Sequence, residues 1–464
     1  MGAAAVAVPE APPSPAGPID EADLAGLRTP PEIPLPKHIQ ILRFNQRQIE
    51  FVFKAHRKLG EVFMMNGYRE PDAVTSHPDH VKSLFTANPE QAPSLTAESP
   101  LRPILGPNSV LTANGPRHLR QRKLLLPPFH GEAIERYSQM ISEAAEREID
   151  TWPIGEPFAL APRMQAITLD VIMAGIFGIE GEPGPGTPEH ALRRAVRGLV
   201  DFSTKPIAQL GELLNIGSDE PKAPLRAAMA ILDRPTYQVI RARREAGDLG
   251  GRSDILSLLL QATTEEGEHL TDQELRDELL TLVLAGHETT ANQLAWTWER
   301  LLRWPEAHER LREAVRNGHD AEGEVERVVL ESMRSRPVIP MIGRRVRLPW
   351  RFGEFGVPAG TPVLMSILLV HHREDLYPEP FDFLPERWED RKPGTYEWIP
   401  FGGGTRRCLG AALAMAEQRV VLDAMARRLD LEAAEPEPER ALHRNVTMIP
   451  ARGARVVVRT LSAA

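Results

Sequence analysis

The chain has 464 residues, of which 42% are hydrophobic, and it carries a formal net charge of −9 at pH 7. No composition break divides its middle, so we expect one large domain from residue 37 to residue 464. The negative charge argues against nonspecific binding to nucleic acid. The single cysteine excludes a disulfide framework and fits the reducing cytoplasm.

The first 36 residues are rich in alanine and proline. This composition predicts a flexible or extended arm, because such a segment cannot bury enough apolar surface to fold by itself. The opening residues 1–8 contain no basic residue and are too short for a signal core or a membrane span. We therefore expect a cytoplasmic protein without a membrane span.

Short strands and many helices are predicted beyond the arm. Residues 61–66 and 72–76 have the composition of strands, and residues 78–85 that of a helix. Another β region is expected over residues 345–367, where three glycines mark turns. Helical patterns fill most of the remainder, so the fold class is mainly α with a small β-sheet region.

One helix stands out by its length. Thr271 and Glu274 form a capping box, apolar residues recur from Leu279 to Leu294, and Pro305 follows the expected end. A helix of roughly 30 residues is about 45 Å long and could cross a whole domain.

Inside this helix, Glu288 adjoins Thr289. A titratable group beside a hydroxyl is what general acid delivery of a proton requires. Taken alone, however, a helical threonine usually bonds back to its own helix and a helical glutamate is usually solvated. A catalytic role for this pair therefore requires further evidence from elsewhere in the chain.

Two further charged pairs are ambiguous by themselves. His118 and Arg122 lie on one helical face within a basic run, which is most often a solvated surface. Glu331 and Arg334 are spaced by three, and an exposed pair of that kind contributes only tenths of a kcal/mol, roughly 0.2–0.5.

The most informative segment is Phe401 to Gly410, read FGGGTRRCLG. It places the only cysteine, Cys408, in a glycine-rich loop ahead of a helical pattern, where the helix dipole should favour the thiolate. A thiolate on such a loop can hold haem iron and favours O–O cleavage. The alternative is an inert buried cysteine.

Five ordered residues decide between these two readings. Phe401, Gly404, Arg406, Cys408 and Gly410 match the signature F-x-x-G-x-R-x-C-x-G at every fixed position, and from about residue 37 onward the chain resembles the cytochrome P450 superfamily. The resemblance implies haem b buried between the long helix and the cysteine loop. Cys408 would be the axial iron ligand, and Phe401 would shield its sulfur from water. The backbone at Gly404 and Gly410 would approach the haem closely.

The resemblance also assigns roles on the long helix. Ala285 and Gly286 would adjoin the haem and leave room for dioxygen, while Glu288 and Thr289 would deliver protons. His287, which might be mistaken for an iron ligand, receives no role.

Charged residues elsewhere acquire roles in the same way. His118, Arg122, Arg406 and Arg344 would meet the haem propionates, although neighbouring Arg345 could replace Arg344. A buried structural network supporting the cysteine loop would be formed by Glu331, Arg334 and Arg387.

As implied by the resemblance, the activity is that of a haem-thiolate monooxygenase that inserts one atom of O2 into a hydrophobic substrate. Hydroxylation or epoxidation of a fatty acid, terpenoid or steroid is expected, since the segments that would line the pocket are largely apolar. The expected pocket residues are Leu111, Val338, Ile339, Met448 and Ile449.

The chain shows no dinucleotide-binding fingerprint and no cluster-binding cysteines, so electrons should come from an external ferredoxin or flavodoxin with its reductase. We expect that donor to dock near Cys408, helped by Arg391, Lys392, Arg407 and Arg120. Two alternatives remain open: a peroxygenase driven by hydrogen peroxide, which the Glu288 and Thr289 pair disfavours, and a non-enzymatic haem sensor or carrier.

Overall fold

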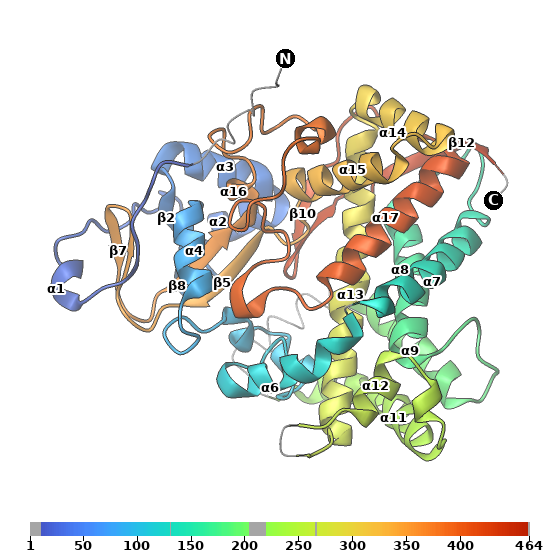
Figure 1. Ribbon diagram of the computed structural model, residues 1–464. Helices are drawn as coiled ribbons and strands as arrows, with labels where there is room; N and C mark the ends of the chain where they lie inside the picture. The colour runs from blue at the N-terminus through green and yellow to red at the C-terminus, as the bar shows by residue number, and fades with distance from the viewer. Residues whose placement is uncertain (1–10, 130, 204–219, 265–266, 463–464) are drawn as a thin grey trace.

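A helix-rich region and a smaller β-rich region make up the molecule in the computed structural model, which describes residues 11–129, 131–203, 220–264 and 267–462 (Figure 1). Strands β2, β5, β7 and β8 lie on one side with the N-terminal helices, and long helices fill the other side, where β12 also lies. The expected fold class, mainly α with a small β region, is confirmed.

The helices have the following bounds: α1 (Glu21–Leu24), α2 (Lys37–Gln46), α3 (Gln48–Leu59), α4 (Pro78–Thr86), α5 (Arg102–Leu105), α6 (Gly115–Leu125), α7 (Glu132–Ile149), α8 (Leu160–Phe177), α9 (Pro188–Ser203), α11 (Ala223–Glu245), α12 (Ile255–Gln261), α13 (Asp272–Leu301), α14 (Pro305–Asn317), α15 (Ala321–Ser335), α16 (Ile367–Val370) and α17 (Ala411–Arg428).

The strands are β1 (Ala16–Pro18), β2 (Val62–Asn66), β3 (Pro71–Thr75), β4 (Pro157–Ala159), β5 (Met341–Arg345), β6 (Trp350–Phe352), β7 (Phe355–Val357), β8 (Pro362–Ser366), β9 (Leu429–Ala433), β10 (Ala441–Arg444), β11 (Thr447–Pro450) and β12 (Arg455–Leu461). The strands expected near residues 61–66, 72–76 and 345–367 are all present.

Four small sheets are formed by these strands. The largest has the order β2-β3-β8-β5, in which β3 and β8 run parallel and the other pairs antiparallel. The others are β1-β6-β7, β4-β12-β9 and the hairpin β10-β11. Since β5 and β8 come late in the chain, the sheet ties the N-terminal strands to the segment that carries Arg344.

The N-terminal segment is extended, and its described part packs against the domain. Strand β1 pairs with β6, Arg28 and Glu32 form isolated bridges to Phe355 and Met64, and Ile33 is buried in a cluster with α3. Residues 16–33 are therefore held in place, and the flexible form of the expected arm does not apply to them.

Helix α13 crosses the domain as predicted (Figure 1). Both hydrogen bonds of the Thr271 and Glu274 capping box are present at its start. It packs against α8, α15 and α17, and most of its residues from Thr290 to Leu301 are buried. Helix α8 alone among the described helices is long and apolar enough to cross a membrane, but 72% of it is buried inside the protein, as in a core helix.

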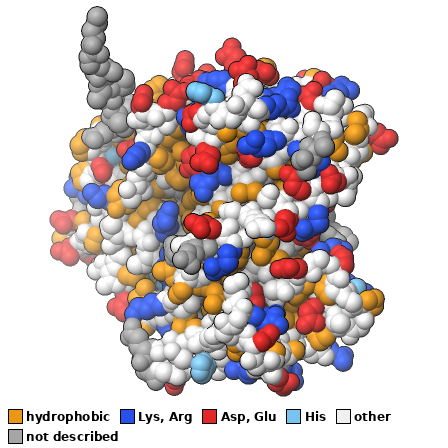
Figure 2. Space-filling view, turned by 45° about the vertical axis from the view of Figure 1, so that its right-hand side comes forward, with side chains coloured by type: hydrophobic (Ala, Val, Ile, Leu, Met, Phe, Trp, Pro, Cys, Tyr) orange, Lys and Arg blue, Asp and Glu red, His pale blue; other side chains and the backbone are white. Residues whose placement is uncertain are grey.

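Charges of both signs cover the surface. Figure 2 shows lysine and arginine side chains interspersed with aspartate and glutamate on one face of the molecule. This mixed pattern accords with the net charge, which argued against a broad basic surface for nucleic acid.

Candidate active site

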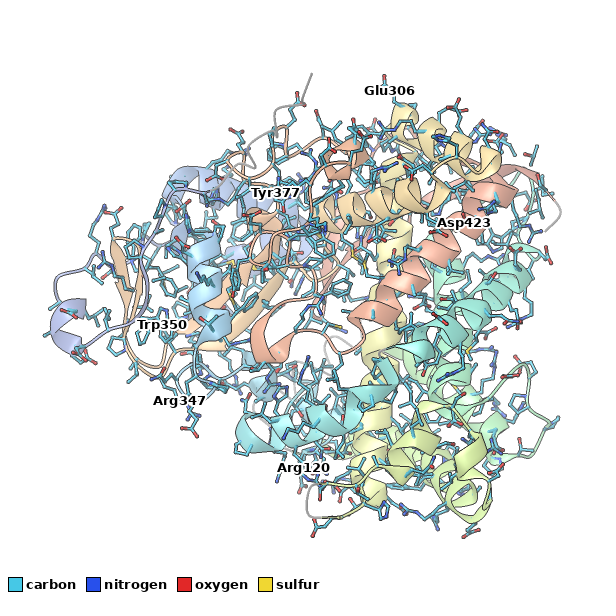
Figure 3. All side chains as sticks on the ribbon, viewed as in Figure 1. Arg120, Glu306, Arg347, Trp350, Tyr377 and Asp423 are labelled. Carbon is cyan, nitrogen blue, oxygen red and sulfur yellow. The ribbon has the colours of Figure 1, made fainter. Side chains whose placement is uncertain are left out.

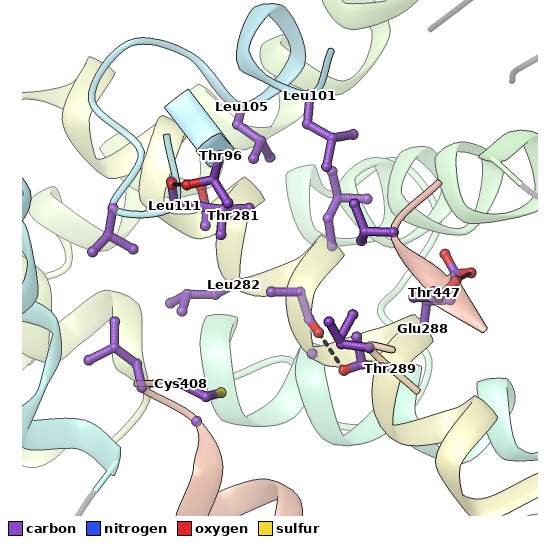
Figure 4. A pocket seen from close by; sticks show the side chains of 18 of the residues that line it. Thr96, Leu101, Leu105, Leu111, Thr281, Leu282, Glu288, Thr289, Cys408 and Thr447 are labelled. Atoms are coloured by element: carbon purple, nitrogen blue, oxygen red, sulfur yellow. Dashed lines mark hydrogen bonds between the residues drawn. The ribbon is translucent and has the colours of Figure 1, made fainter. Parts of the chain in front are cut away.

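A cavity of about 1330 Å³ lies between α13 and the loop that carries Cys408. Figure 4 shows Cys408 on one side of it and Thr289 on another, with Leu101, Leu105 and Leu282 among the apolar side chains. Cavities for one small ligand are usually about 300–1,000 Å³. This one therefore has room for a planar cofactor and an organic guest together.

The cysteine loop packs tightly against α4. A Cβ atom on Gly403 would lie 2.2 Å from the Phe85 ring, and one on Gly404, whose φ is +63°, would lie 2.1 Å from the Phe85 carbonyl oxygen. Gly404 does not line the cavity, whereas Gly410 does and has open space beside it. Gly410 thus has the position and the open space that a close approach to a cofactor requires. Gly404 instead allows the loop to pack against α4.

Cys408 faces the cavity from the end of this loop. Its backbone N–H donates to the Phe401 carbonyl at 2.9 Å, and Phe401, which also lines the cavity, stacks edge-on to Trp398. Burial raises the pKa of the thiol, and this outweighs the opposing effects of the Gly410 backbone N–H and of Arg407 and Arg122. The Gly410 N–H lowers the pKa, as expected of the helix terminus, and a bound metal would deprotonate a coordinating thiol outright.

Four basic side chains line the cavity near this loop: His118, Arg122, Arg344 and Arg406. Burial lowers the pKa of Arg344 to about 10, and burial with the neighbouring Arg344 and Arg122 lowers the pKa of Arg406 to about 9. Burial, Arg406, Arg122 and Arg344 lower the pKa of His118 to about 3. Arg406 donates to the carbonyl oxygens of Val110 and Leu111, at 3.2 and 3.3 Å.

Within the described chain, neither Arg344 nor Arg406 forms an ion pair with a carboxylate. A buried cation without a counter-charge is costly, so this cluster fits a ligand that brings carboxylates with it. The two propionates of haem have that chemistry. The residues present therefore fit the group that Cys408 would hold.

Arg345, the alternative to Arg344, is engaged elsewhere. It forms ion pairs with Glu70 at 2.8 Å and with Glu98 at 2.7 Å, and it does not line the cavity. The alternation of side chains along β5 sends these neighbours to opposite faces.

The two neighbouring arginines make a matched test. Arg344→Leu should release haem about tenfold faster or more, because a charge-assisted hydrogen bond contributes about 1.5–3 kcal/mol. Arg345→Leu should leave haem retention nearly unchanged and lose only its pairs with Glu70 and Glu98. The rate of haem transfer to excess apomyoglobin measures both, and equal rates in the two variants would contradict the assignment.

Helix α13 presents Ala285, Gly286, Glu288 and Thr289 to the cavity. The Thr289 hydroxyl donates to the Ala285 carbonyl at 2.7 Å, which is the back-bond usual for a helical threonine (Figure 4). His287 points away and lies within 3.0 Å of the Gln165 carbonyl oxygen, in keeping with its lack of an assigned role.

Glu288 has partners that the sequence did not reveal. Its Oε1 accepts hydrogen bonds from Arg444 Nε and Nη2 at 2.9 and 2.7 Å and from the Thr447 hydroxyl at 3.1 Å. Arg444 and Thr447 belong to the hairpin β10-β11, about 160 residues along the chain. No local pattern links them to α13, because the hairpin returns from the far end of the chain.

The charged network that supports the cysteine loop is fully buried at its centre, Glu331 and Arg334, and partly exposed at Arg387. Arg334 binds both oxygens of Glu331 at 2.8 Å, and both side chains are 0% exposed. Arg387 Nε donates to Glu331 at 3.1 Å, and the indole of Trp388 donates to it at 3.0 Å. Trp388 also contacts Trp398, which in turn contacts Phe401, so the network reaches the cysteine loop through aromatic rings.

Three of the five expected pocket residues, Leu111, Val338 and Ile339, line the cavity. Met448 and Ile449 do not, so that expectation is wrong. Met448 is 0% exposed and packs with Trp296 and Ala441. The reason is the hairpin geometry: the turn before β11 reaches the cavity, and the strand itself leads away from it. Val446 and Thr447, from the expected segment 446–450, do line the cavity, and the one lining residue of this hairpin that sequence reasoning missed among the described residues is Asn445.

A buried carboxyl group, Glu417 on α17, also lines the cavity. Burial raises its pKa from 4.5 to about 8, and its Oε1 has no hydrogen-bond partner in the described residues. A glutamate in a helical pattern reads as a solvated group, so the sequence carries no signal for it.

Glu417 should make stability fall with rising pH. Below about pH 4.5 the group is protonated in both states, but between about pH 4.5 and pH 8 only the unfolded state ionises, which favours unfolding. Glu417→Gln should therefore stabilise the protein by about 3–5 kcal/mol at pH 9 and much less near pH 4.5. Urea unfolding at both pH values measures this effect. Asp423→Asn, in an exposed ion pair on the same helix, should change stability by less than about 1 kcal/mol at either pH.

Comparisons with known proteins agree with this site. The family model described as Cytochrome P450 matches residues 28–458. A putative cytochrome P450 137 of Mycobacterium tuberculosis is 37% identical over 388 residues, covering 83% of this chain and 80% of the relative. A putative cytochrome P450 138 of Mycobacterium bovis is 35% identical over 436 residues, covering 93% and 97%.

Solved structures share the fold. A retinoic acid-bound cyanobacterial CYP120A1 has a TM-score of 0.77 at 23% identity, over 94% of this chain and 100% of that chain. The haem domain of cytochrome P450DA has a TM-score of 0.78 at 24% identity, over 94% and 98%. Because the family model spans almost the whole described chain and the relatives align along it, this chain belongs to the cytochrome P450 family of haem-thiolate monooxygenases.

Proposed function

We propose that this enzyme works in the cytoplasm and inserts one oxygen atom from O2 into a hydrophobic organic substrate, by hydroxylation or epoxidation. The observation that carries the proposal is one apolar cavity lined by Cys408, by the basic cluster and by the Glu288 and Thr289 pair. In hydroxylation, one oxygen atom enters a C–H bond and the other leaves as water, with two electrons and two protons consumed.

Haem bound at Cys408 would supply oxygen activation, since a thiolate ligand favours O–O cleavage. The chain's own residues supply the protons. All three hydrogen bonds to Glu288 reach its Oε1, which leaves Oε2 to carry a proton toward Thr289 Oγ1. The Thr289 hydroxyl can pass it on, because a hydroxyl both donates and accepts.

Apolar side chains from several elements give the cavity its character, among them Leu105, Leu111, Ile172, Leu282 and Ile339. They exclude water from the reacting atoms and bind an apolar guest. This lining supports a hydrophobic substrate over a small polar one.

An external donor must supply the electrons, and we propose a ferredoxin or flavodoxin that docks on the cysteine-loop side. Arg407 and Lys392 are exposed there. Arg120, on the outer side of α6 (Figure 3), pairs with Glu274 at 2.7 Å and keeps partial exposure. Arg391 is bound to Glu397 and lies over the Tyr377 ring with 11% exposure, so the expectation that it meets the donor is wrong.

Product analysis under isotopically labelled O2 tests the proposal. Ferric protein is reduced by a ferredoxin and its reductase in the presence of a mixed apolar substrate panel. We expect a product that carries one labelled oxygen atom, and no product from Cys408→Ser. Product with hydrogen peroxide but none with reductant would instead identify a peroxygenase, and haem binding without product under either condition would identify a sensor or carrier.

A further inference from the structure

Helix α9 carries three arginines, of which two are bound by acidic side chains. Arg193 pairs with Asp170 at 2.6 Å and with Glu182 at 3.3 Å, and Arg197 pairs with Glu182 at 3.6 Å. The third, Arg194, is exposed and forms no ion pair with any residue that the structure describes. It also lines the large cavity.

The position of Arg194 on α9 directs it to the mouth of this cavity. Arg194, Ala195, Gly198 and Leu199 all line the cavity, and their spacings of one, three and four residues place them on one helical face. A Cβ atom on Gly198 would meet nothing within 4 Å, so no side chain one turn along covers the guanidinium. Arg194 is exposed on α9, and Cys408 lines the same cavity from the loop that precedes α17.

Helix α11 forms another part of the same rim. It packs against α9 and contributes Leu225 and Ile231, the latter 70% exposed, while Lys222 caps its start and also lines the cavity. The rim therefore combines positive charge with apolar surface. A guest that enters here passes a guanidinium before it reaches the apolar interior.

Negative charge is scarce along the cavity. Among its described lining residues, the only acidic side chains are Glu288, which is bound by Arg444, and Glu417, which is buried and whose pKa burial raises to about 8. The basic cluster near Cys408 would be taken by the haem propionates, so an anionic group on a guest would meet attraction at Arg194 and apolar surroundings deeper inside. An unpaired charge in that interior would be costly, so an anionic head should stay at the mouth.

We propose that the substrate is an amphiphile with a carboxylate head and a long apolar body, of the fatty-acid class, and that Arg194 binds the carboxylate at the cavity mouth. This inference rests on the proposed function. It also sets the orientation: the head stays at α9, and the apolar end reaches toward Cys408 and Thr289. Oxidation then falls on carbon atoms remote from the carboxylate.

The sequence predicted only an apolar pocket, because α9 is not among the segments that were expected to line it. The pairing of Arg193 and Arg197 with acids, which singles out Arg194, depends on contacts between separate elements.

Optical titration of the purified ferric protein tests the proposal by binding and without turnover. Palmitic acid and its methyl ester are compared in the parent protein, in Arg194→Gln and in the control Arg197→Gln, with the Soret band as readout. We expect the acid to bind more tightly than the ester, and Arg194→Gln to weaken acid binding by about 2- to 5-fold, as for loss of one exposed ion pair. Ester binding should not change, and Arg197→Gln should behave like the parent protein.

Ionic strength supplies a second readout. Affinity for the acid should fall with added salt in the parent protein and should be less sensitive to salt in Arg194→Gln, because salt screens exposed charges. Equal affinity of the acid and the ester in the parent protein, unchanged acid binding in Arg194→Gln, or no binding of either ligand would overturn the proposal.

Failure of the proposed function has a different signature. A protein that lacks the spectrum of a thiolate-ligated haem–CO complex before any ligand is added would contradict the function itself. Tight, Arg194-dependent binding of the acid without any oxidised product would support the role of Arg194 in binding the carboxylate. The same result would contradict the proposed monooxygenase function.

Discussion

Replacing Glu331 by alanine should leave a folded but haem-poor protein, or no stable protein at all. The substitution strands the buried guanidinium groups of Arg334 and Arg387 and removes the acceptor of the Trp388 indole. Removing one partner of a buried charge network costs about 3–5 kcal/mol. Since Trp388 and Trp398 connect this network to Phe401, the damage should reach the loop that carries Cys408.

The haem-to-protein ratio after purification and the urea midpoint measure this effect. Glu326→Ala is the matched control, because Glu326 lies on the same helix and pairs with Arg419 at the surface, with side chains 37% and 40% exposed. It should change stability by about 0–1 kcal/mol and leave the haem content intact. A normal haem content in Glu331→Ala would contradict the proposal that the network supports the cysteine loop.

Thr289→Ala should uncouple oxygen consumption from product formation. The variant loses the hydroxyl that, in the proposed function, receives a proton from Glu288, and proton transfer by a positioned group contributes about 100-fold or more to a rate. We expect the yield of product per electron to fall by about 10- to 100-fold, with the electrons recovered as hydrogen peroxide. Reductant consumption, product and peroxide are measured in one reaction.

Thr289→Ser provides the control for this result, since it keeps the hydroxyl and its back-bond to the Ala285 carbonyl. It should retain most of the coupling, and the Soret response to substrate should be the same in both variants. Coupled turnover in Thr289→Ala equal to that of the parent protein would exclude Thr289 from proton delivery.

Local features of the chain predicted much of this architecture. The capping box at Thr271 and the long apolar pattern predicted α13, while strand-like composition and turn-marking glycines predicted β2, β3 and the region around β8. Such elements are encoded by neighbouring residues, so a single sequence suffices to recognise them. The cysteine signature is likewise contiguous, and it placed Cys408, Phe401 and Gly410 at one cavity.

Features that depend on distant contacts were missed or wrong. The partner of Glu288 is Arg444, and the exclusion of Met448 from the cavity follows from how the hairpin β10-β11 is seated against α13. Arg391 looked like a free surface cation, yet its side chain lies over Tyr377. In each case the deciding contact joins residues of different elements, and composition or spacing carries no record of it.

The sequence by itself determined the family and the type of chemistry, and it pointed to Cys408 as the iron ligand, because these features reside in a short loop and one helix whose residues are consecutive. Only the tertiary structure decided which arginines are paired with acidic side chains. It separated Arg344 from Arg345 and Arg194 from Arg193. The physical reason is that burial and counter-charges are properties of packed elements, and both are set by residues far away in the chain.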